Sequence, residues 1–340
     1  MSNPIKIGLV GLGRAGMSMH CPELAGKESK FQIIAVCDVI PERTAELAVQ
    51  YGCATYERVE DLVADPNVEL VDIATRSCDH FAHSMLALQA GKLVLIEKPM
   101  CPTHEQALRL QAAANGRLYI RHNRRFEPAF IQIREIIASG LLGDVFEIKL
   151  SRVGYQRRDD WQTLKEFCGG QLLNWGPHII DHALRLLEAP VADLWSNLQL
   201  VTAVGDAEDH LKIVLTGTNG RVVDLEISGG AALGVPEWLV WGTRGALSCS
   251  GDEIKLRYLD PKVPLEDRQP EPGTPGATFG SAETLQWVEE TVTAKPAGAW
   301  AIWDELYAAI REGKAFPITL DEAVGVMEIV SKVKQGTPFA

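Results

Sequence analysis

An apolar run leads directly into a glycine-rich turn near the start of the chain, where residues 5–16 read IKIGLVGLGRAG. The run predicts a buried β-strand. Gly11, Gly13 and Gly16 then follow the G-x-G-x-x-G spacing of a strand-to-helix turn that binds a pyrophosphate. The first glycine permits the tight turn, the second lets the backbone approach the phosphates, and the third allows close helix packing. The chain therefore begins as a candidate dinucleotide-binding unit.

An acidic residue ends the second apolar run, FQIIAVCD, at Asp38. A carboxylate about 20 residues beyond the glycines accepts hydrogen bonds from the adenosine ribose hydroxyls and repels a 2′-phosphate. We therefore expect NAD as the bound cofactor, and we expect NADP to bind less well. Arg43 is close enough in sequence to reach such a phosphate and would weaken that preference.

Short apolar runs alternate with helical patterns over the first 120 residues. The runs are nearly continuous, as in parallel strands covered by helices on both faces, and they span 5–11, 31–38, 68–75, 92–98 and 117–122. Two intervening helices are predicted to stop at Gly52 and Gly91, and a third begins with a capping box from Thr103 to Gln106. This repetition predicts an α/β, doubly wound domain over residues 1–122.

The pattern changes after residue 122. A helical stretch over 126–143 leads into a strand over 143–155, and Asn219-Gly220 joins two alternating runs as a hairpin. Residues 260–280 are rich in Pro and Gly, which predicts a long surface loop, and a final helix opens with a capping box at Thr319. We expect an α+β domain over 123–340 with a mostly antiparallel sheet, whose last helices can pack back on the first domain.

Composition excludes several classes of function. A formal net charge of −12 argues against a nucleic-acid surface, which needs clustered Lys and Arg. The seven cysteines are scattered and never spaced C-x-x-C, so neither a disulfide framework nor a zinc site is indicated. No basic leader and no run of 18 apolar residues occurs, which predicts a cytoplasmic protein without a membrane segment.

The fourth apolar run ends in Glu97, Lys98 and Pro99. Ligands of doubly wound sheets bind at the carboxyl ends of the strands, so we expect Lys98 to face the nicotinamide end of a cleft. Its ammonium can hydrogen-bond an oxygen that is being oxidised or reduced and stabilise the alkoxide.

A second group of titratable residues lies in GGQLLNWGPHIIDH (169–182). Pro177 suits the first helical position, which brings His178, Asp181 and His182 onto one helical face. On spacing alone three interpretations stay open: a capped amphipathic helix, a metal site of H-x-x-D-H type with no obvious fourth ligand, and acid/base chemistry with a partner elsewhere.

Several motifs in the same order, GLGRAG, CD followed by ER, EKP, RRFEP and GG-x4-WGPH-x-x-D, resemble the Gfo/Idh/MocA family of oxidoreductases along nearly the whole chain. The resemblance implies a Rossmann domain, a second domain with a large open sheet, and a nicotinamide cofactor. It implies sugars, inositols or their derivatives as substrates, and pairing of subunits through the sheet as a homodimer or homotetramer. It also implies a cis bond before Pro99 and catalytic roles for Lys98 and His178.

The resemblance further implies an acid/base role for His178 and contact between Asp181 and substrate hydroxyls. The sequence departs from the family at Asn174, where many members have Asp. Asn can orient a ring but cannot stabilise an imidazolium by charge, so either Asp181 supplies the charge or the chemistry differs from simple alcohol oxidation. His182 is expected in core packing or a subunit contact, and is also a substrate-side candidate.

A second departure is Arg76, where the family often has Pro after Thr75; Arg76 could contact cofactor or substrate. His80 is expected to be structural or on the adenine side. No metal ligand is expected. The candidate cofactor-binding residues are Gly11, Leu12, Gly13, Arg14, Ala15, Asp38, Arg43, Thr75, Arg76, His80, Glu97 and Lys98, and the candidate substrate-binding residues are Asn123, Arg124, Tyr155, Arg157, Trp161 and His182.

Three functions remain open from the sequence. The first is an NAD-dependent dehydrogenase acting on a secondary hydroxyl of a sugar, inositol or sugar acid. The second is a lyase or glycosidase that oxidises its substrate transiently and recycles tightly held NAD, which Asn174 favours. The third is a non-catalytic sugar or dinucleotide sensor on the same fold, which would not need Lys98 or His178.

Overall fold

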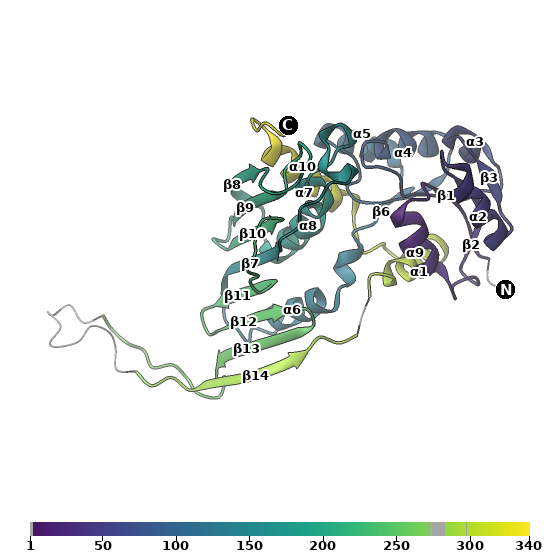
Figure 1. The fold of residues 1–340 in the computed structure, drawn as a ribbon. Helices are drawn as coiled ribbons and strands as arrows, with labels where there is room; N and C mark the ends of the chain where they lie inside the picture. Colours follow the sequence, from purple (N-terminus) through teal and green to yellow (C-terminus); the bar gives the residue numbers. More distant parts are fainter. Residues whose placement is uncertain (1–2, 271–272, 274–282, 297) are drawn as a thin grey trace.

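The computed structural model describes residues 3–270, 273, 283–296 and 298–340 (Figure 1). Within these residues the chain forms two β-sheets, each with its own helices, which occupy different parts of the molecule. No described helix is both long enough and apolar enough to cross a bilayer.

The first sheet is parallel throughout, and its described strands are β1 (Ile5–Val10), β2 (Phe31–Cys37), β3 (Ala54–Tyr56), β4 (Leu70–Ile73), β5 (Leu93–Ile96) and β6 (Leu118–Ile120). Their order, β3-β2-β1-β4-β5-β6, is that of a doubly wound dinucleotide-binding sheet and confirms the predicted α/β fold. Strand β3 was not predicted, because three residues with exposed or half-buried side chains carry no periodic signal.

The helices of the first domain follow the predicted punctuation. Their bounds are η1 (Gly16–His20), α1 (Cys21–Leu24), α2 (Pro41–Tyr51), α3 (Val59–Ala64), α4 (His80–Gln89) and α5 (His104–Ala114). Gly52 ends α2 with φ of 62°, a left-handed conformation that glycine adopts without strain. The hydroxyl of Thr103 accepts the backbone N–H of Gln106 and caps α5, which is one half of the predicted capping box; the Gln106 side-chain oxygen does not complete it.

The second sheet runs in the order β14-β13-β12-β11-β7-β10-β9-β8 among the described residues. Its strands are β7 (Val145–Val153), β8 (Val191–Gln199), β9 (His210–Gly217), β10 (Val222–Ser228), β11 (Trp238–Gly242), β12 (Gly245–Ser250), β13 (Glu253–Leu259) and β14 (Trp287–Thr293). All neighbours are antiparallel except β7 and β10, which confirms the mostly antiparallel prediction.

Helices cover one face of this sheet. They are η2 (Asn123–Phe126), α6 (Pro128–Ala138), η3 (Trp161–Thr163), η4 (Lys165–Phe167), α7 (Gln171–Asn174) and α8 (Gly176–Leu187). Helix α8 packs on β7, β9 and β10 and buries Ile180, Ala183 and Leu187 completely. The predicted hairpin joins β9 to β10, and the Asn219 side chain donates to the Leu187 carbonyl at 3.0 Å.

The two edge strands, β8 and β14, were not predicted. Each has hydrogen-bonded neighbours on one side only, and their side chains are mostly exposed or half-buried, so neither shows a clear alternation. The predicted loop has no regular structure over residues 260–270, and its remainder, apart from residue 273, lies outside the described residues.

The last two helices, α9 (Ala301–Arg311) and α10 (Leu320–Lys334), contact the first domain, and Figure 1 shows α9 beside α1. Arg311 forms a bidentate ion pair with Glu69, which precedes β4. At α10, Thr319 and Glu322 form the predicted capping box in full, and the Ser331 hydroxyl accepts the backbone N–H that starts α5.

A buried charge network lies under the carboxyl ends of β4, β5 and β6. His20 contacts Asp72 through Nδ1 at 2.7 Å and Glu97 through Nε2 at 3.0 Å. Arg121 donates to the same Glu97 oxygen at 2.8 Å and to Glu23. Burial alone would lower the pKa of His20, but the charge of Asp72 and the two carboxylate hydrogen bonds outweigh it and raise that pKa to about 9. His20 is therefore an imidazolium that fixes Glu97, the residue before Lys98.

This network predicts a specific dependence of stability on pH. Because the folded pKa of His20, about 9, exceeds the unfolded value of 6.5, its contribution is complete below pH 6.5 and is lost as pH rises through 9. We expect roughly 3 kcal/mol of unfolding free energy to disappear over that interval, from 1.36 kcal/mol per pKa unit. His20→Gln should remove this slope in urea titrations at pH 6 to 10. His104→Gln, outside the network, should keep it; equal slopes in all three proteins would contradict the assignment.

Candidate functional site

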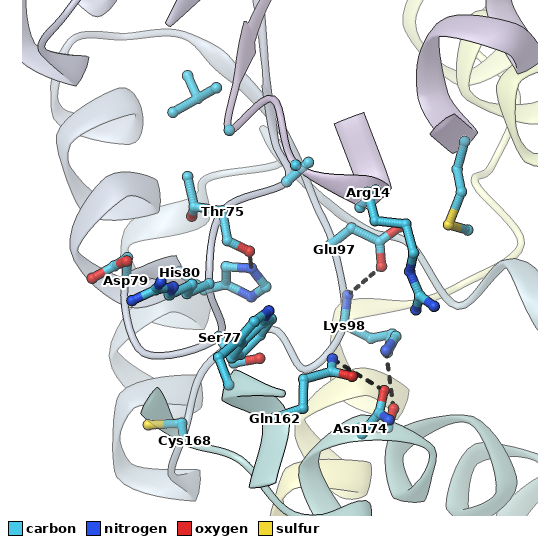
Figure 2. A pocket seen from close by; sticks show the side chains of 18 of the residues that line it. Arg14, Thr75, Ser77, Asp79, His80, Glu97, Lys98, Gln162, Cys168 and Asn174 are labelled. Carbon is cyan, nitrogen blue, oxygen red and sulfur yellow. Dashed lines mark hydrogen bonds between the residues drawn. The ribbon is translucent and has the colours of Figure 1, made fainter. Parts of the chain in front are cut away.

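A cleft of about 1090 Å³ opens at the carboxyl ends of the first sheet and reaches helices α7 and α8 of the second domain. Figure 2 shows Lys98, Asn174 and Gln162 close together, and His80 farther from them, near Thr75 and Asp79. The predicted residues that line the cleft are Gly11, Gly13, Arg14, Ala15, Asp38, Arg43, Thr75, Arg76, His80, Glu97, Lys98, Asn123, Arg124, Trp161, Asn174 and His178. The cleft therefore collects side chains from both domains.

The three glycines have the spatial requirements that their spacing predicts. Gly11 has φ of 90°, and a Cβ there would lie 2.7 Å from the Ala74 carbonyl carbon. A Cβ on Gly16 would lie 2.2 Å from the Gly11 carbonyl oxygen. A Cβ on Gly13 would meet no protein atom within 4 Å, so its open side faces the cleft. A dinucleotide fits this arrangement because only Gly13 leaves room for a ligand against the backbone.

The first helix departs from a regular α-helix. The turn that follows the glycines is the π-helix η1, which continues into the four-residue α1. His20 is the last residue of η1, and from there its ring reaches the buried carboxylates. Such single-turn π segments occur frequently at functional sites.

Asp38 lies at the end of β2, and backbone donors hold both of its oxygens. Leu12 N–H donates to Oδ2 at 2.6 Å and Ile40 N–H donates to Oδ1 at 2.9 Å. The Leu12 side chain is fully buried and does not line the cleft, so its predicted cofactor contact is replaced by a role in holding Asp38. Arg43 lies at the cleft, 3.8 Å from Oδ2 of Asp38, where it can meet the adenosine end of a ligand.

Arg76 and His80 connect loops around the cleft. The Arg76 guanidinium stacks 4.3 Å from the ring centroid of Phe167 and 5.7 Å from that of Trp161, so it bridges the two domains. His80 lies 2.6 Å from the Pro99 carbonyl oxygen through Nδ1 and 3.1 Å from the Thr75 carbonyl through Nε2. His80 thus ties the Thr75 loop to the turn after β5, in accordance with its expected structural role.

Lys98 is held at the meeting point of the domains. The Lys98–Pro99 bond is cis, as the resemblance implied. Lys98 Nζ donates to the backbone carbonyl oxygen of Asn174 at 2.9 Å (Figure 2). Burial is the main cause that lowers the pKa of Lys98, Arg14 and Arg124 lower it further, and Glu97 opposes them. The ammonium thus donates a hydrogen bond to a neutral carbonyl of the second domain rather than forming an ion pair with it.

Asn174 is the last residue of α7, and His178 follows Trp175 in the first turn of α8. The Asn174 side-chain oxygen accepts a hydrogen bond from Gln162 at 3.4 Å. His178 stands in the first turn of α8, is nearly fully buried, and has an Nδ1 without a hydrogen-bond partner among the described residues. Burial, followed by the charge of Lys98, holds the pKa of His178 well below 6.5, so the ring is neutral and able to accept a proton.

The structure does not bring Asp181 and His182 to the cleft. Both Asp181 oxygens accept hydrogen bonds from Arg125, so this carboxylate is neutralised within the second domain. His182 stacks on Phe130 with ring centroids 3.9 Å apart, and its Nε2 contacts the Arg124 carbonyl oxygen at 3.0 Å. His182 therefore packs within the second domain, which is one of the roles expected for it, and it also lines a smaller hollow beside the cleft. No group of three metal-ligating side chains converges within the described residues.

Two further substrate candidates lie away from the cleft. Tyr155 is 62% exposed and forms an isolated bridge with Gly230, and Arg157 is exposed outside the lining. Arg158, a candidate from the same loop, does line the cleft, whereas sequence reasoning missed Asp160, Gln162 and Trp175. Trp175 lies within the WGPH motif, and Gln162 follows Trp161, so both were adjacent to recognised signals.

The chain matches two family models. Residues 5–120 match one described as an oxidoreductase family with an NAD-binding Rossmann fold, and residues 130–248 match a GFO/IDH/MocA C-terminal domain.

Curated relatives and solved structures match nearly the full chain. The chain is 27% identical to scyllo-inositol 2-dehydrogenase (NADP(+)) IolW of Bacillus subtilis over 98% of its own length and 94% of the relative. It is 30% identical to the uncharacterized oxidoreductase YdgJ of Escherichia coli, over 97% of this chain and 95% of that one. An NAD-binding protein from Listeria innocua superposes with a TM-score of 0.81 at 25% identity, over 96% and 93% of the two chains.

The glycine geometry predicts opposite outcomes for two substitutions. Gly13→Val should leave the thermal midpoint nearly unchanged, because a Cβ at this position meets no protein atom within 4 Å, but should weaken NADH binding about tenfold or more. Gly16→Ala should lower stability by about 1–3 kcal/mol, because its Cβ overlaps the Gly11 carbonyl. Thermal unfolding and NADH fluorescence titration measure both properties. A Gly13→Val protein that binds NADH normally would exclude the dinucleotide from this turn.

Proposed function

Because the chain belongs to the Gfo/Idh/MocA family of NAD-binding oxidoreductases, we propose that it transfers hydride between nicotinamide and a secondary hydroxyl or keto group of a sugar, inositol or sugar acid. The supporting observation is that Lys98 and His178, from different domains, line one cleft, with Lys98 bonded to the carbonyl four residues before His178. Scyllo-inositol dehydrogenase activity in the name of a relative agrees with a polyhydroxylated substrate.

NAD would be held by the Gly11–Gly16 turn, by Arg14 and Ala15, and by the Asp38 carboxylate at the ribose. When bound, the nicotinamide supplies the hydride acceptor or donor. Asp38 opposes a 2′-phosphate, which favours NAD over NADP. Arg43, 3.8 Å from Asp38, is the group through which NADP would be tolerated, and the name of one relative specifies NADP.

The residues of the inner cleft divide the chemistry between them. The Lys98 ammonium has donors left after its bond to Asn174, and one of them can bind the substrate oxygen and stabilise its alkoxide character. Neutral His178 accepts the hydroxyl proton during oxidation and returns it during reduction. Asn174 holds Lys98 through its backbone, and Gln162 holds the Asn174 side chain. Asp181 takes no part, because Arg125 occupies its carboxylate.

A second candidate function is favoured by Asn174. A carboxylate at this position would stand beside Lys98 and support an imidazolium by charge, whereas the neutral amide does not. A lyase or glycosidase of this kind oxidises its substrate transiently and then returns the hydride to the substrate-derived product. Because the two redox steps cancel, the reaction releases no net proton and depends less on a charged partner for His178. Such an enzyme would hold NAD tightly and would turn over without added cofactor.

We also propose assembly as a homodimer or homotetramer through the sheet face opposite α8. In support, Trp195 on β8 and Trp287 on β14 are 54% and 41% exposed on strands at the two edges of this sheet. Large exposed aromatic side chains are enriched at interfaces between subunits.

One experiment tests the proposed function and separates it from the second candidate. The purified protein is denatured and assayed for released NAD(H), and the native protein is screened against sugars, inositols and sugar acids at the absorbance of NADH. Net NADH formation from some substrate supports the dehydrogenase. Lys98→Met should then lower kcat about 100- to 1000-fold while NADH still binds, and the exposed Lys255→Met should not. Co-purified NAD with product but no net NADH would replace the dehydrogenase with the recycling enzyme.

The electrostatics of His178 predict the pH profile of oxidation. Since burial and Lys98 hold its pKa well below 6.5, kcat/KM should stay level as pH falls to 6.5 and should decline only in more acidic buffer. Arg124 also lowers the pKa of His178, so Arg124→Gln should move this acidic limb to higher pH. Steady-state rates from pH 4.5 to 9 measure both effects. A wild-type limb centred above 6.5 would contradict the assignment of His178 as the buried base.

A further inference from the structure

A charged residue extends an apolar row on the covered face of the second sheet. Side chains two apart on a strand share a face, so Ile148, Leu150 and Arg152 of β7 point to the side that α8 covers. Ile148 and Leu150 are buried in the core, whereas Arg152 remains accessible to solvent. Strand β7 thus places the Arg152 guanidinium near the N-terminal end of α8, the helix that carries His178.

Two guanidiniums lie over the ring of Trp175. The guanidinium carbon of Arg152 lies 3.3 Å from the Trp175 ring centroid, and that of Arg124 lies 4.8 Å from it. The ring of His178 is 5.5 Å from the same indole. Because stacking on an indole fixes the plane of a guanidinium, its N–H groups remain directed outward for hydrogen bonding.

The stack borders a hollow that adjoins the cleft. This hollow has a volume of about 230 Å³ and shares Arg124, Trp175 and His178 with the cleft. Arg152 lines the hollow but not the cleft. A substrate whose reacting carbon lies against His178 can therefore extend one end into the hollow.

Arg152 lacks a counter-ion at contact distance. Three carboxylates line the hollow, those of Glu127, Glu237 and Asp252. Glu127 pairs with Arg124, whereas the Arg152 side chain has no ion pair or hydrogen bond within the part of the chain that the structure describes. Burial, followed by repulsion from Arg124, lowers the pKa of Arg152 despite Glu237 and Glu127. The N–H groups of the Arg152 guanidinium are therefore available to an acceptor that enters the hollow.

We infer that the hollow binds an anionic group of the substrate, a carboxylate or a phosphate, through Arg152 with Arg124 beside it. Arginine binds carboxylates and phosphates through two parallel N–H groups. The contact therefore selects for the orientation of the anion as well as for its charge. This inference rests on the proposed function and narrows its substrate class to polyhydroxylated anions. Arg152 is then a specificity-determining residue that takes no part in the proton or hydride transfer.

The test compares each anion with its neutral parent. Binding of D-glucose, D-gluconate, D-glucuronate, D-glucose 6-phosphate, myo-inositol and myo-inositol 1-phosphate to the NADH-saturated protein is measured by calorimetry, which needs no turnover. Anions should bind about tenfold or more tightly than their parents, as expected for a charge-assisted contact. Comparison of the carboxylate compounds with the phosphate compounds shows which of the two anionic groups the hollow binds. Where a substrate turns over, Arg152→Gln should raise its KM roughly 10- to 100-fold and change kcat less.

Variants separate charge recognition from structure. Arg152→Gln should abolish the preference for anions, Arg152→Lys should restore part of it, and Arg109→Gln, which removes a guanidinium stack on Phe81 between α5 and α4, should leave it intact. Neutral and anionic ligands that bind equally well, or an anion preference that survives Arg152→Gln, would overturn the inference. Absence of NADH formation with every compound would instead refute the proposed redox function, while the binding data would still decide the role of Arg152.

Discussion

The hydrogen bond from Lys98 to the Asn174 carbonyl is the contact through which one domain presents its chemistry to the other. Its geometry depends on a chain of buried charges. His20 fixes Glu97 at the carboxyl end of β5, and Glu97 accepts the backbone N–H of Lys98 at 3.1 Å. Arg121 completes the arrangement from β6. Because these ions are buried, removing one would leave the others without compensation, which makes the position of Lys98 strongly determined.

The first domain was largely predictable from sequence because local signals and tertiary structure agree there. Gly11 and Gly16 occupy positions where a Cβ would overlap backbone, so their spacing reports a real steric requirement. Continuous apolar runs corresponded to strands buried on both faces, and strand ends located Asp38 and Lys98 at the cleft. The network around His20 was not predictable, because its members are 52 and 77 residues apart and no short-range pattern connects them.

The second domain was less predictable because the direction of a helical face is set by its neighbours. The spacing of His178, Asp181 and His182 placed them on one face, as expected. However, a helical face wide enough for three residues meets more than one neighbour: His178 meets the cleft, Asp181 meets Arg125, and His182 meets Phe130. A single sequence contains the periodicity of α8, but the partners come from η2 and α6, and nothing in the helix itself specifies them.

Because residue 174 is a neutral Asn, the second domain places no carboxylate at this position beside Lys98. Asp181 cannot replace the missing carboxylate, since Arg125 binds both of its oxygens. Lys98 therefore has Glu97 as its counter-ion, and Glu97 also serves His20 and Arg121. The inner cleft, with Arg14 and Arg124 near Lys98, then has an excess of positive charge in a protein with a net charge of −12. A site of that sign stabilises an alkoxide and at the same time favours a ligand that brings its own negative charge.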